Sequence, residues 1–358
     1  MIPKSRTSAP RLAVFVGTGL QARIAAAIVP DLTTVCDVEV VSLDPLYQFG
    51  IDLTWTDDVH TIGRRHGDAW YERSRLQKAR LLPGFCARMT RLAQRVTHAL
   101  FYVDTGILER TAIRILGGLG VRTVVLQDAM KRRPKQGPEG GLTWFGAGGA
   151  DLYLVCGERY RALCPPDRTR VVGSPILPSR LTADTGGDQI TFVNQCFARY
   201  GEVDLETEVA FVREVVSAAR KYGPVEVRLH PHNDPAAYAG LAGSPGAQSV
   251  RVVQHDPLPE TLAAARVVMG VNSTVLLEAL AVGIPVFSLA WHPSPFELPV
   301  GPVVHRCDSL GAMERSLASM PDPPDSVAVA QELEAHVAAS GQEAVTRITR
   351  AIDGFVKT

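Results

Sequence analysis

The sequence predicts an α/β fold with two Rossmann-like domains facing a central cleft. Short apolar runs of strand length alternate with helical patterns along most of the 358 residues. This alternation is typical of βαβ units and parallel sheets covered by helices. It stops in a polar, turn-rich stretch between Gly173 and Gln189 and then starts again. The length also suits two cores better than one.

The first half of the chain contains six predicted strands. They cover Leu12–Val16, Val38–Leu43, Ala99–Val103, Arg122–Gln127, Asp151–Cys156 and Arg170–Val172, with helical patterns at Leu20–Val29, Phe85–Val96 and Ile107–Leu116. The segment Asp44–Leu82 is less regular and rich in charge, including Asp52, Asp57, Asp58, Arg64, Arg65, His66 and Asp68. Two interpretations of this segment stay open: a solvated excursion, or a loop that holds an acceptor.

The second half repeats the pattern after the turn-rich stretch. Strands are predicted at Ile190–Gln195, Val225–Leu229, Val250–Val253, Val267–Met269 and Val286–Leu289, and helices at Leu205–Tyr222 and Leu276–Ala281. The last ~50 residues have a helical pattern. We therefore expect an N-terminal Rossmann-like domain over 1–178 on the acceptor side. A C-terminal nucleotide-sugar-binding domain is expected over 186–340, followed by a C-terminal helix over 341–358.

Composition excludes several classes of protein. Lys+Arg and Asp+Glu both number 37, so bulk charge gives no reason to expect a nucleic-acid partner. The six cysteines form no C-x-x-C pair, which indicates reduced thiols and a cytoplasmic location. No apolar stretch reaches the ~20 residues of a membrane span, and the N-terminal residues lack a signal-peptide core. Peripheral membrane contact is left open. We see no metal-binding motif and expect no bound cofactor.

The first motif that could take part in binding or catalysis is the run RLHPH, which begins at Arg228. His230 follows the predicted strand Val225–Leu229, and ligands of open parallel sheets bind beyond the carboxyl ends of strands. Pro231 stiffens the turn that directs the histidine. His230 could donate a hydrogen bond to a phosphate, and Arg228 could add a bidentate contact. A histidine that only caps the loop is the alternative.

The second motif is GVNSTVLLEA, which begins at Gly270 and follows the strand Val267–Met269. Asn272 or Ser273 is a suitable N-cap for the next helix. A helix start offers free N–H groups and a positive dipole end, so it can bind an anion. Thr274 adds a hydroxyl donor. Glu278 lies one turn further on the same face, where a carboxylate can accept hydrogen bonds from a ribose.

Together the two motifs resemble those of bacterial surface-polysaccharide glycosyltransferases of the GT-B fold. The resemblance rests on Arg-x-His-Pro followed by Ser-Thr-x-x-x-Glu-Ala-x-x-x-Gly-x-Pro-Val. The families concerned are capsule transferases, polysialyltransferase-like enzymes and CDP-glycerol glycerophosphotransferases. The resemblance covers roughly residues 228–289. By this resemblance, His230, Ser273 and Thr274 would hold the donor's phosphates. Glu278 would hold its ribose.

Two aspartates of the first half are candidate catalytic bases. Asp128 ends the strand Arg122–Gln127, at a position resembling the Asp-Gly or His-Gly of these families, with Ala129 replacing the glycine. It could deprotonate an acceptor hydroxyl. Asp104, after the strand Ala99–Val103, is the second candidate. The run KRRPK, from Lys131 to Lys135, is either a solvated loop or a contact for an anionic acceptor.

A glycine-rich turn gives a competing interpretation. Gly17, Gly19 and Ala22 fit the dinucleotide fingerprint G-x-G-x-x-A after the first strand, and Asp44 ends the second strand. This spacing is typical of NAD-binding Rossmann domains. GT-B proteins also place a glycine turn after their first strand, where it faces the acceptor.

The leading hypothesis is a metal-independent glycosyltransferase. It would move a sugar, or a related group, from a nucleotide-activated donor to a hydroxyl of a carbohydrate or other acceptor. Without a metal, the leaving phosphate must be stabilised by histidine, hydroxyls and a helix N-terminus, and the C-terminal half supplies all three. The alternatives are a sugar-nucleotide epimerase of the same fold, an NAD(P)-dependent oxidoreductase, and a non-catalytic partner of a transferase.

Overall fold

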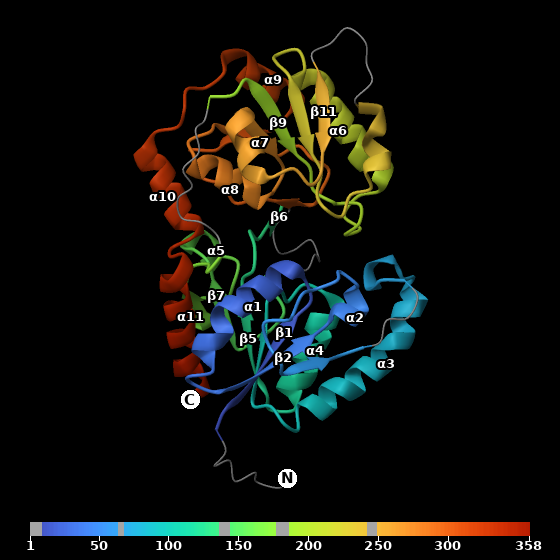
Figure 1. Ribbon diagram of the computed structural model, residues 1–358, viewed down its shortest axis with the longest axis vertical. Coiled ribbons are helices and arrows are strands. Elements are labelled where there is room, and N and C mark those ends of the chain that lie inside the picture. Colours follow the sequence, from blue (N-terminus) through green and yellow to red (C-terminus); the bar gives the residue numbers. More distant parts are fainter. Residues whose placement is uncertain (1–8, 64–67, 136–143, 177–185, 242–248) are drawn as a thin grey trace. The chain divides into compact units, whose positions relative to one another are not determined.

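The computed structural model describes residues 9–63, 68–135, 144–176, 186–241 and 249–358. The chain forms two compact units (Figure 1). Unit 1 comprises Met1–Asp128, Thr143–Leu177 and His336–Thr358, and unit 2 comprises Ala129–Leu142 and Pro178–Ala335. Each unit has a parallel sheet with helices, which confirms the predicted α/β fold of two Rossmann-like domains. The predicted boundary at residue 178 lies outside the described residues.

Unit 1 is built on a seven-stranded sheet in the order β3-β2-β1-β4-β5-β7-β8, and every ladder in it is parallel. Its strands are β1 (Arg11–Val16), β2 (Asp37–Ser42), β3 (Val59–Thr61), β4 (His98–Phe101), β5 (Arg122–Leu126), β7 (Leu152–Val155) and β8 (Thr169–Val171). Its helices are α1 (Gly19–Leu32), α2 (Asp44–Tyr47), α3 (Arg75–Leu92), α4 (Ile107–Gly118), α5 (Glu158–Arg161) and α11 (Gly341–Val356).

Side-chain alternation in β1 explains the two cores of this unit. Leu12 and Val14 point to one face, where they pack in a cluster with residues of α1 and α11. Ala13 and Phe15 point to the other face and join a cluster with residues of α3 and α4. A strand buried on both faces reads as a continuous apolar run, as β1 does. Figure 1 shows α1 and α11 side by side against the sheet.

Unit 2 has a six-stranded parallel sheet in the order β11-β10-β9-β12-β13-β15. Its strands are β9 (Gln189–Val193), β10 (Val225–Arg228), β11 (Val250–Val253), β12 (Ala265–Gly270), β13 (Val286–Leu289) and β15 (His305–Cys307), and its helices are α6 (Leu205–Ala219), α7 (Leu258–Ala264), α8 (Thr274–Ala281), α9 (Leu310–Ser319) and α10 (Ser326–His336). A separate antiparallel pair joins β6 (Arg133–Pro134) to β14 (Phe296–Glu297).

Two apolar clusters cover the two faces of this second sheet. Val267 and Met269 of β12 pack with residues of α6 and α9. Val268, between them in sequence, packs with residues of α7 and α8. Both sheets therefore bury both faces, and polar chemistry is left to the loops at the strand ends.

The described parts of the segment Asp44–Leu82 contain more regular structure than its composition predicts. It contains α2, the strand β3 paired in parallel with β2, and the first part of α3. Helix α3 begins at Arg75 rather than at Phe85, because Ser74 and Gln77 form a capping box that starts it earlier. Pro83 lies inside this helix without ending it. Arg64, Arg65 and His66 lie outside the described residues.

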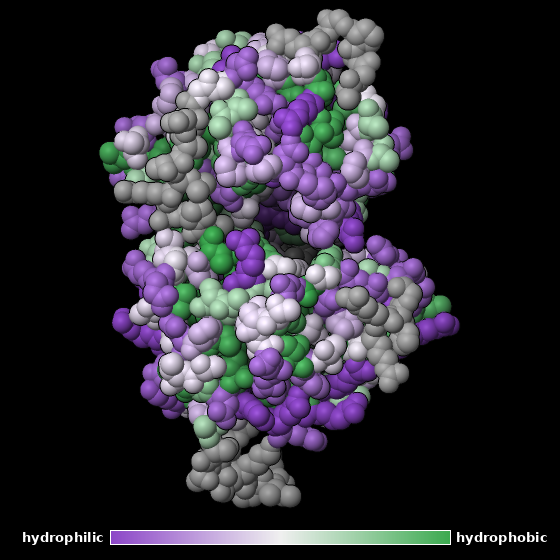
Figure 2. Space-filling model, in the orientation of Figure 1, coloured by the Kyte–Doolittle hydropathy of each residue, from purple (hydrophilic) through white to green (hydrophobic). Residues whose placement is uncertain are grey.

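The surface mixes polar and apolar residues. On the face shown in Figure 2, hydrophilic and hydrophobic residues are interspersed. All six cysteines are free thiols, and five of them are buried. Within the described ranges, no helix has both the length and the apolar character that crossing a bilayer requires.

Candidate functional site

The sheet of unit 2 has a switch point at β9. Strand β10 pairs with β9 on one side and β12 pairs with it on the other. Helix α6, which follows β9, packs on one face of the sheet, and α8, which follows β12, packs on the other. Ligands of open parallel sheets bind beyond the carboxyl ends of the strands at such a point. His230 follows β10, and Asn272 and Ser273 follow β12. The structure thus brings the two predicted motifs to one edge of one sheet.

His230 is held with one ring nitrogen inward. Its Nδ1 accepts a hydrogen bond from the backbone N–H of His232 at 3.1 Å and lies 3.3 Å from the Cys196 thiol. The proton of the neutral ring must therefore be on Nε2, which no described residue binds. Burial, and then the neighbouring His232 and Arg199, lower the pKa of His230 to about 4. At neutral pH this side chain is an uncharged hydrogen-bond donor.

A buried carboxylate fixes the loop that carries His230. Glu208 of α6 is fully buried. It accepts hydrogen bonds from Asn194, from Asn233 and from the Tyr238 hydroxyl. The Ala198 backbone N–H donates to its second oxygen at 2.6 Å. Burial and this carboxylate raise the pKa of Tyr238, which keeps the hydroxyl protonated as a donor. The network ties the loops after β9 and β10 to one helix.

An open pocket lies beside this network. It has a volume of about 300 Å³ and is lined in part by Arg199, His232 and Asp234. Burial and Arg199 lower the pKa of His232. Ala198 and Leu205 also line it, so polar and apolar side chains share this space.

The start of α8 has the expected cap. Ser273 is the N-cap residue, and its Oγ accepts from the Val275 N–H at 3.2 Å. Asn272 precedes it. With its amide oriented to accept, the Asn272 oxygen lies 3.0 Å from Arg132 Nη1 and 2.9 Å from Arg132 Nε. Arg132 therefore orients the Asn272 side chain beside the positive end of the helix, and that helix end favours an anion.

Arg132 belongs to the basic run that begins at Lys131. Its two terminal nitrogens donate to the two carboxylate oxygens of Glu202 at 2.6 and 2.5 Å. Its guanidinium also lies 5.0 Å from the centre of the Phe296 ring. From the sequence, this run was either a solvated loop or a contact for an anionic acceptor. The structure shows instead that Arg132 is bound within unit 2.

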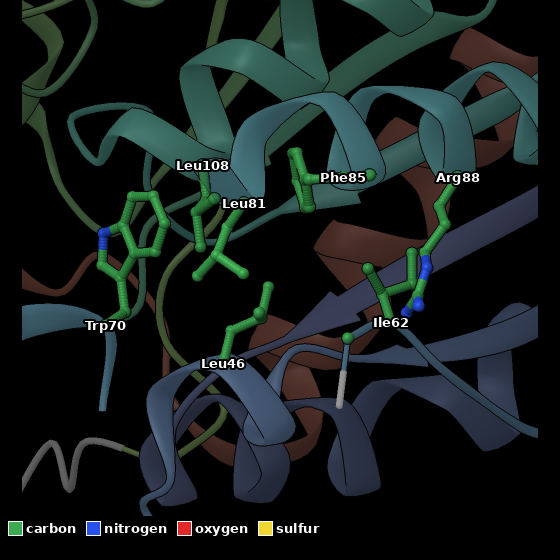
Figure 3. Close-up of a pocket in the computed structure, with 9 residues that line it drawn as sticks. Leu46, Ile62, Trp70, Leu81, Phe85, Arg88 and Leu108 are labelled. Atoms are coloured by element: carbon green, nitrogen blue, oxygen red, sulfur yellow. The ribbon is translucent and has the colours of Figure 1, made fainter. Parts of the chain in front are cut away.

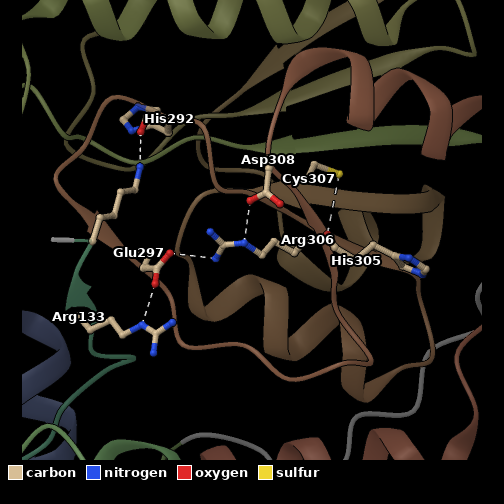
Figure 4. Close-up of polar contacts among 8 residues, drawn as sticks. Arg133, His292, Glu297, His305, Arg306, Cys307 and Asp308 are labelled. Atoms are coloured by element: carbon tan, nitrogen blue, oxygen red, sulfur yellow. Dashed lines mark hydrogen bonds and ion pairs between the residues drawn. The ribbon is translucent and has the colours of Figure 1, made fainter. Parts of the chain in front are cut away.

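Two other cations of the run, Arg133 and Lys135, are bound in the same unit (Figure 4). Arg133 donates to Glu297 at 2.7 Å, and Glu297 also accepts from Arg306. Lys135 donates to the backbone carbonyl of His292. Burial, and then Lys135 and Arg132, lower the pKa of His292 to about 3. The pairing of β6 with β14 places Arg133 opposite Glu297.

Three further predicted residues have defined positions. Arg228 donates to the Thr261 hydroxyl at 2.9 Å and to the Asp256 carbonyl at 2.8 Å. It therefore braces the end of β10 against the start of α7 in this structure. Thr274 is the first residue of α8, and Glu278 lies four residues later on the same helix. Both are half-buried, and their spacing places them on one face.

Unit 1 has its own switch point at β1, which is flanked by β2 and β4. The glycine turn follows β1. A Cβ at Gly17 would lie 2.8 Å from the Tyr47 ring, so only glycine fits there. The Gln21 side chain accepts from the Gly17 N–H at 2.8 Å and donates to Asp128 at 2.9 Å. Asp128 is thus held beside the glycine turn, with 6% of its surface exposed.

Asp104 has a different environment from Asp128. It has no exposed surface. Its carboxylate accepts from the backbone N–H groups of Gly146 and Gly148 and from the Tyr153 hydroxyl at 3.1 Å. These donors make Asp104 an anchor for the loop before β7.

A third buried carboxyl group lies in the first turn of α4. Glu109 accepts a hydrogen bond from the Tyr47 hydroxyl, and its Oε2 has no hydrogen-bond partner among the described residues. Burial is the main cause that raises the pKa of Glu109, and the charges of Asp128 and Asp104 add to it. The proximity of these charges indicates that Glu109 and Asp128 share one region of unit 1.

Some residues of these sites were not predicted from the sequence. They are Asn194, Glu208, Asn233, Gln21 and Glu109. Asn194 and Asn233 each follow a strand of unit 2, so they could have been predicted as site residues from their positions after strands. Glu208, Gln21 and Glu109 lie within helical patterns, where nothing in the sequence distinguishes them from surface residues.

Comparison with known proteins identifies the fold. No protein-family model matches the chain, and no curated protein matches it in sequence. A UDP-GlcNAc 2-epimerase from Methanocaldococcus jannaschii, in complex with UDP-GlcNAc and UDP, superposes with a TM-score of 0.61 at 11% identity, covering 96% of this chain and 99% of that one. The Neisseria meningitidis UDP-GlcNAc 2-epimerase bound to UDP-GlcNAc gives 0.59 at 12% identity, covering 98% and 100%.

A glycosyltransferase from Rickettsia africae gives a TM-score of 0.56 at 8% identity, covering 98% of this chain and 99% of that one. At such identities the similarity establishes the fold alone. The chain has the GT-B-type fold expected from its sequence.

Proposed function

We propose that this chain is an enzyme that binds a nucleotide-activated sugar in unit 2 and transfers the sugar, or a related group, to a hydroxyl acceptor. The observation that carries the proposal is the convergence of His230, Ser273 and the α8 N-terminus at the β9 switch point. Each is suited to an anion: a neutral imidazole N–H, a hydroxyl and a positive helix end. Three such groups at the carboxyl edge of one sheet favour the binding of a diphosphate.

Chemistry of this kind needs stabilisation of the leaving phosphate. In the proposal, His230 Nε2–H and the first N–H groups of α8 donate to its oxygens. Arg132, paired with Glu202, holds the Asn272 side chain just before the helix start. Protein groups then do this work without a resident metal ion.

The acceptor hydroxyl must also lose a proton. We assign this step to Asp128, because Gln21 orients its carboxylate beside the glycine turn. Asp104 is less suited, because three donors already surround it. The role of a general base requires an oxygen that can reach substrate.

A nucleotide-binding screen tests the proposal. Melting temperature is measured with CMP, CDP, UDP, GDP, TDP and NAD(H). We expect one nucleoside phosphate to stabilise the protein, by about 2.7 kcal/mol at a concentration 100 times its Kd. Stabilisation by NAD(H), with none by the nucleoside phosphates, would contradict it.

A sugar-nucleotide epimerase is the second candidate, and Glu109 favours it. Epimerisation removes a proton from one face of a carbon and returns one to the other face, so it needs two acid–base groups. Asp128 and Glu109 are two buried carboxyl groups on either side of the glycine turn: Gln21 binds both Asp128 and the Gly17 N–H, and the ring of Tyr47, which donates to Glu109, lies against Gly17. Burial raises the pKa of Glu109. Two solved structures with the same fold are named as UDP-GlcNAc 2-epimerases. Deuterium incorporation into the sugar of UDP-GlcNAc in D₂O, without any acceptor, would favour this candidate.

The oxidoreductase interpretation has less support. The Gly17 N–H, which would face a pyrophosphate, is bonded to Gln21, and the Asp128 carboxylate stands beside it. A diphosphate there would meet negative charge. Asp44, which would hold the ribose, accepts from the Gly50 N–H at 2.8 Å instead. A non-catalytic partner would bind the donor without turnover on any acceptor.

The narrower resemblance to capsule, polysialyltransferase-like and CDP-glycerol transferases rests on the two motifs alone. Under the proposal, cytidine nucleotides and uridine nucleotides are both candidate donors, and the screen decides between them. A carbohydrate acceptor, a role in polysaccharide synthesis, a cytoplasmic location and peripheral membrane contact belong to the same proposal.

We expect Glu278→Gln to weaken ribonucleotide binding by about tenfold with little change in melting temperature. A hydrogen bond to a charged group contributes about 1.5–3 kcal/mol, and Glu278 is half-buried on α8 with no core role in the apolar cluster there. Calorimetry with ribose and 2′-deoxyribose nucleotides measures the effect. Equal affinity of the wild-type protein for both sugars would remove the ribose role.

A further inference from the structure

Unit 1 contains an apolar cavity that neither proposed role uses (Figure 3). Its volume is about 140 Å³. Figure 3 shows aliphatic and aromatic side chains gathered between Trp70 and Arg88, among them Leu46, Leu81 and Phe85. An apolar cavity of about 150 Å³ is large enough for a benzene-sized molecule. The space therefore fits an apolar group of ring size.

One face of α3 forms a wall of this cavity. Leu81, Gly84, Phe85 and Arg88 all line it, and their spacing of three, one and three residues places them on the same side of a helix. No atom lies within 4 Å of a Cβ built at Gly84. The absence of a side chain at Gly84 thus keeps part of the space open.

Arg88 gives the cavity a charged end. It is half-buried, and no carboxylate of the described residues forms an ion pair with it. Helix α3 has five cationic and no acidic residues. The pKa of His60 is lowered, mainly by burial and then by the charges of Arg95 and Arg88. Glu39 and Asp58 act in the opposite direction. Arg88 is thus the cation at this end of the cavity that can attract an anion.

We propose that this cavity binds an amphiphilic ligand, with an apolar ring or short alkyl group between Trp70 and Phe85 and an anionic group at Arg88. Burying the apolar group gives affinity, and the guanidinium orients the anion. Leu46 and Leu108, which line the cavity, are the chain neighbours of Tyr47 and Glu109. If the chain is a transferase as proposed above, this ligand is the acceptor or part of it.

Phenyl phosphate is the probe, and calorimetry on the full chain without nucleotide is the measurement. We expect binding that Gly84→Leu weakens at least tenfold, because the new side chain fills the cavity. Gly117→Leu is the matched control: it lies on α4, its Cβ also meets nothing within 4 Å, and it does not line the cavity. A leucine in place of a helical glycine favours the helix, so neither variant should unfold.

A second pair of variants tests the charged end. Arg88→Gln should weaken phenyl phosphate binding at least fivefold and leave the binding of neutral benzyl alcohol unchanged. Arg91→Gln, on the exposed side of α3, should change neither. Equal phenyl phosphate affinity in wild type and Gly84→Leu overturns the site, and equal affinity in Arg88→Gln overturns its anionic end.

The nucleotide screen on the same samples separates this inference from the proposed function. If the chain binds a nucleotide but Gly84→Leu does not weaken phenyl phosphate binding, the proposed amphiphile site is wrong and the transferase proposal stands. The converse result supports the amphiphile site and counts against the donor site.

Discussion

Asp128→Asn should lower the rate of transfer by about 10²–10⁴-fold and leave nucleotide affinity nearly unchanged. A general base contributes a factor of this size to rate, and its loss appears in turnover rather than in binding. The asparagine oxygen can still accept from Gln21, which holds Asp128 at 2.9 Å, so the fold should persist. Initial rates and calorimetric donor affinity, measured on the same preparation, check both parts.

Asp104→Asn is the parallel variant. Its new amide group would face the Gly146 and Gly148 N–H donors, and an unsatisfied buried polar group costs about 1–3 kcal/mol. We therefore expect a lower melting temperature as its main effect. A normal rate in Asp128→Asn together with a collapsed rate in a folded Asp104→Asn would transfer the catalytic role to Asp104. Normal rates in both would place the base elsewhere.

His230→Ala should weaken donor binding or turnover at least tenfold while the protein stays folded. The neutral ring presents Nε2–H outward because its Nδ1 accepts from the His232 N–H, and a hydrogen bond to a phosphate contributes about 1.5–3 kcal/mol. Nucleotide calorimetry and initial rates measure the loss. His230→Gln should retain part of the function, because its amide can donate from a similar position.

His255→Ala is the matched control for this experiment. His255 follows the neighbouring strand β11 and is exposed, so its loss should leave donor affinity unchanged. Near-normal affinity and rate in His230→Ala would remove this histidine from the site. An equal loss in both variants would indicate a general effect of charge or stability.

The sequence predicted the sheets well for a physical reason. Strands buried on both faces must be apolar throughout, so runs such as Leu12–Val16 and Val267–Met269 are visible without a structure. Residues just after such strands lie at the ligand-binding edge of the sheet. His230, Ser273 and Asp128 could be named as candidates from this rule alone.

The direction of each side chain could not be predicted in the same way. Arg228 contacts α7 because Thr261 and the Asp256 carbonyl lie within its reach, and Asp104 is enclosed by a loop more than 40 residues later in the chain. Contacts between distant segments decide these outcomes. The role of Arg132 depends on Glu202, 70 residues away.

A crystal structure of the chain with the nucleotide selected by the screen tests the central claim most directly. We expect the diphosphate at the carboxyl end of β9, within hydrogen-bond distance of His230 Nε2 and the first N–H groups of α8. Its ribose should lie near Glu278. A diphosphate bound instead at the Gly17–Gly19 turn of unit 1 would contradict the assignment of the donor site to unit 2.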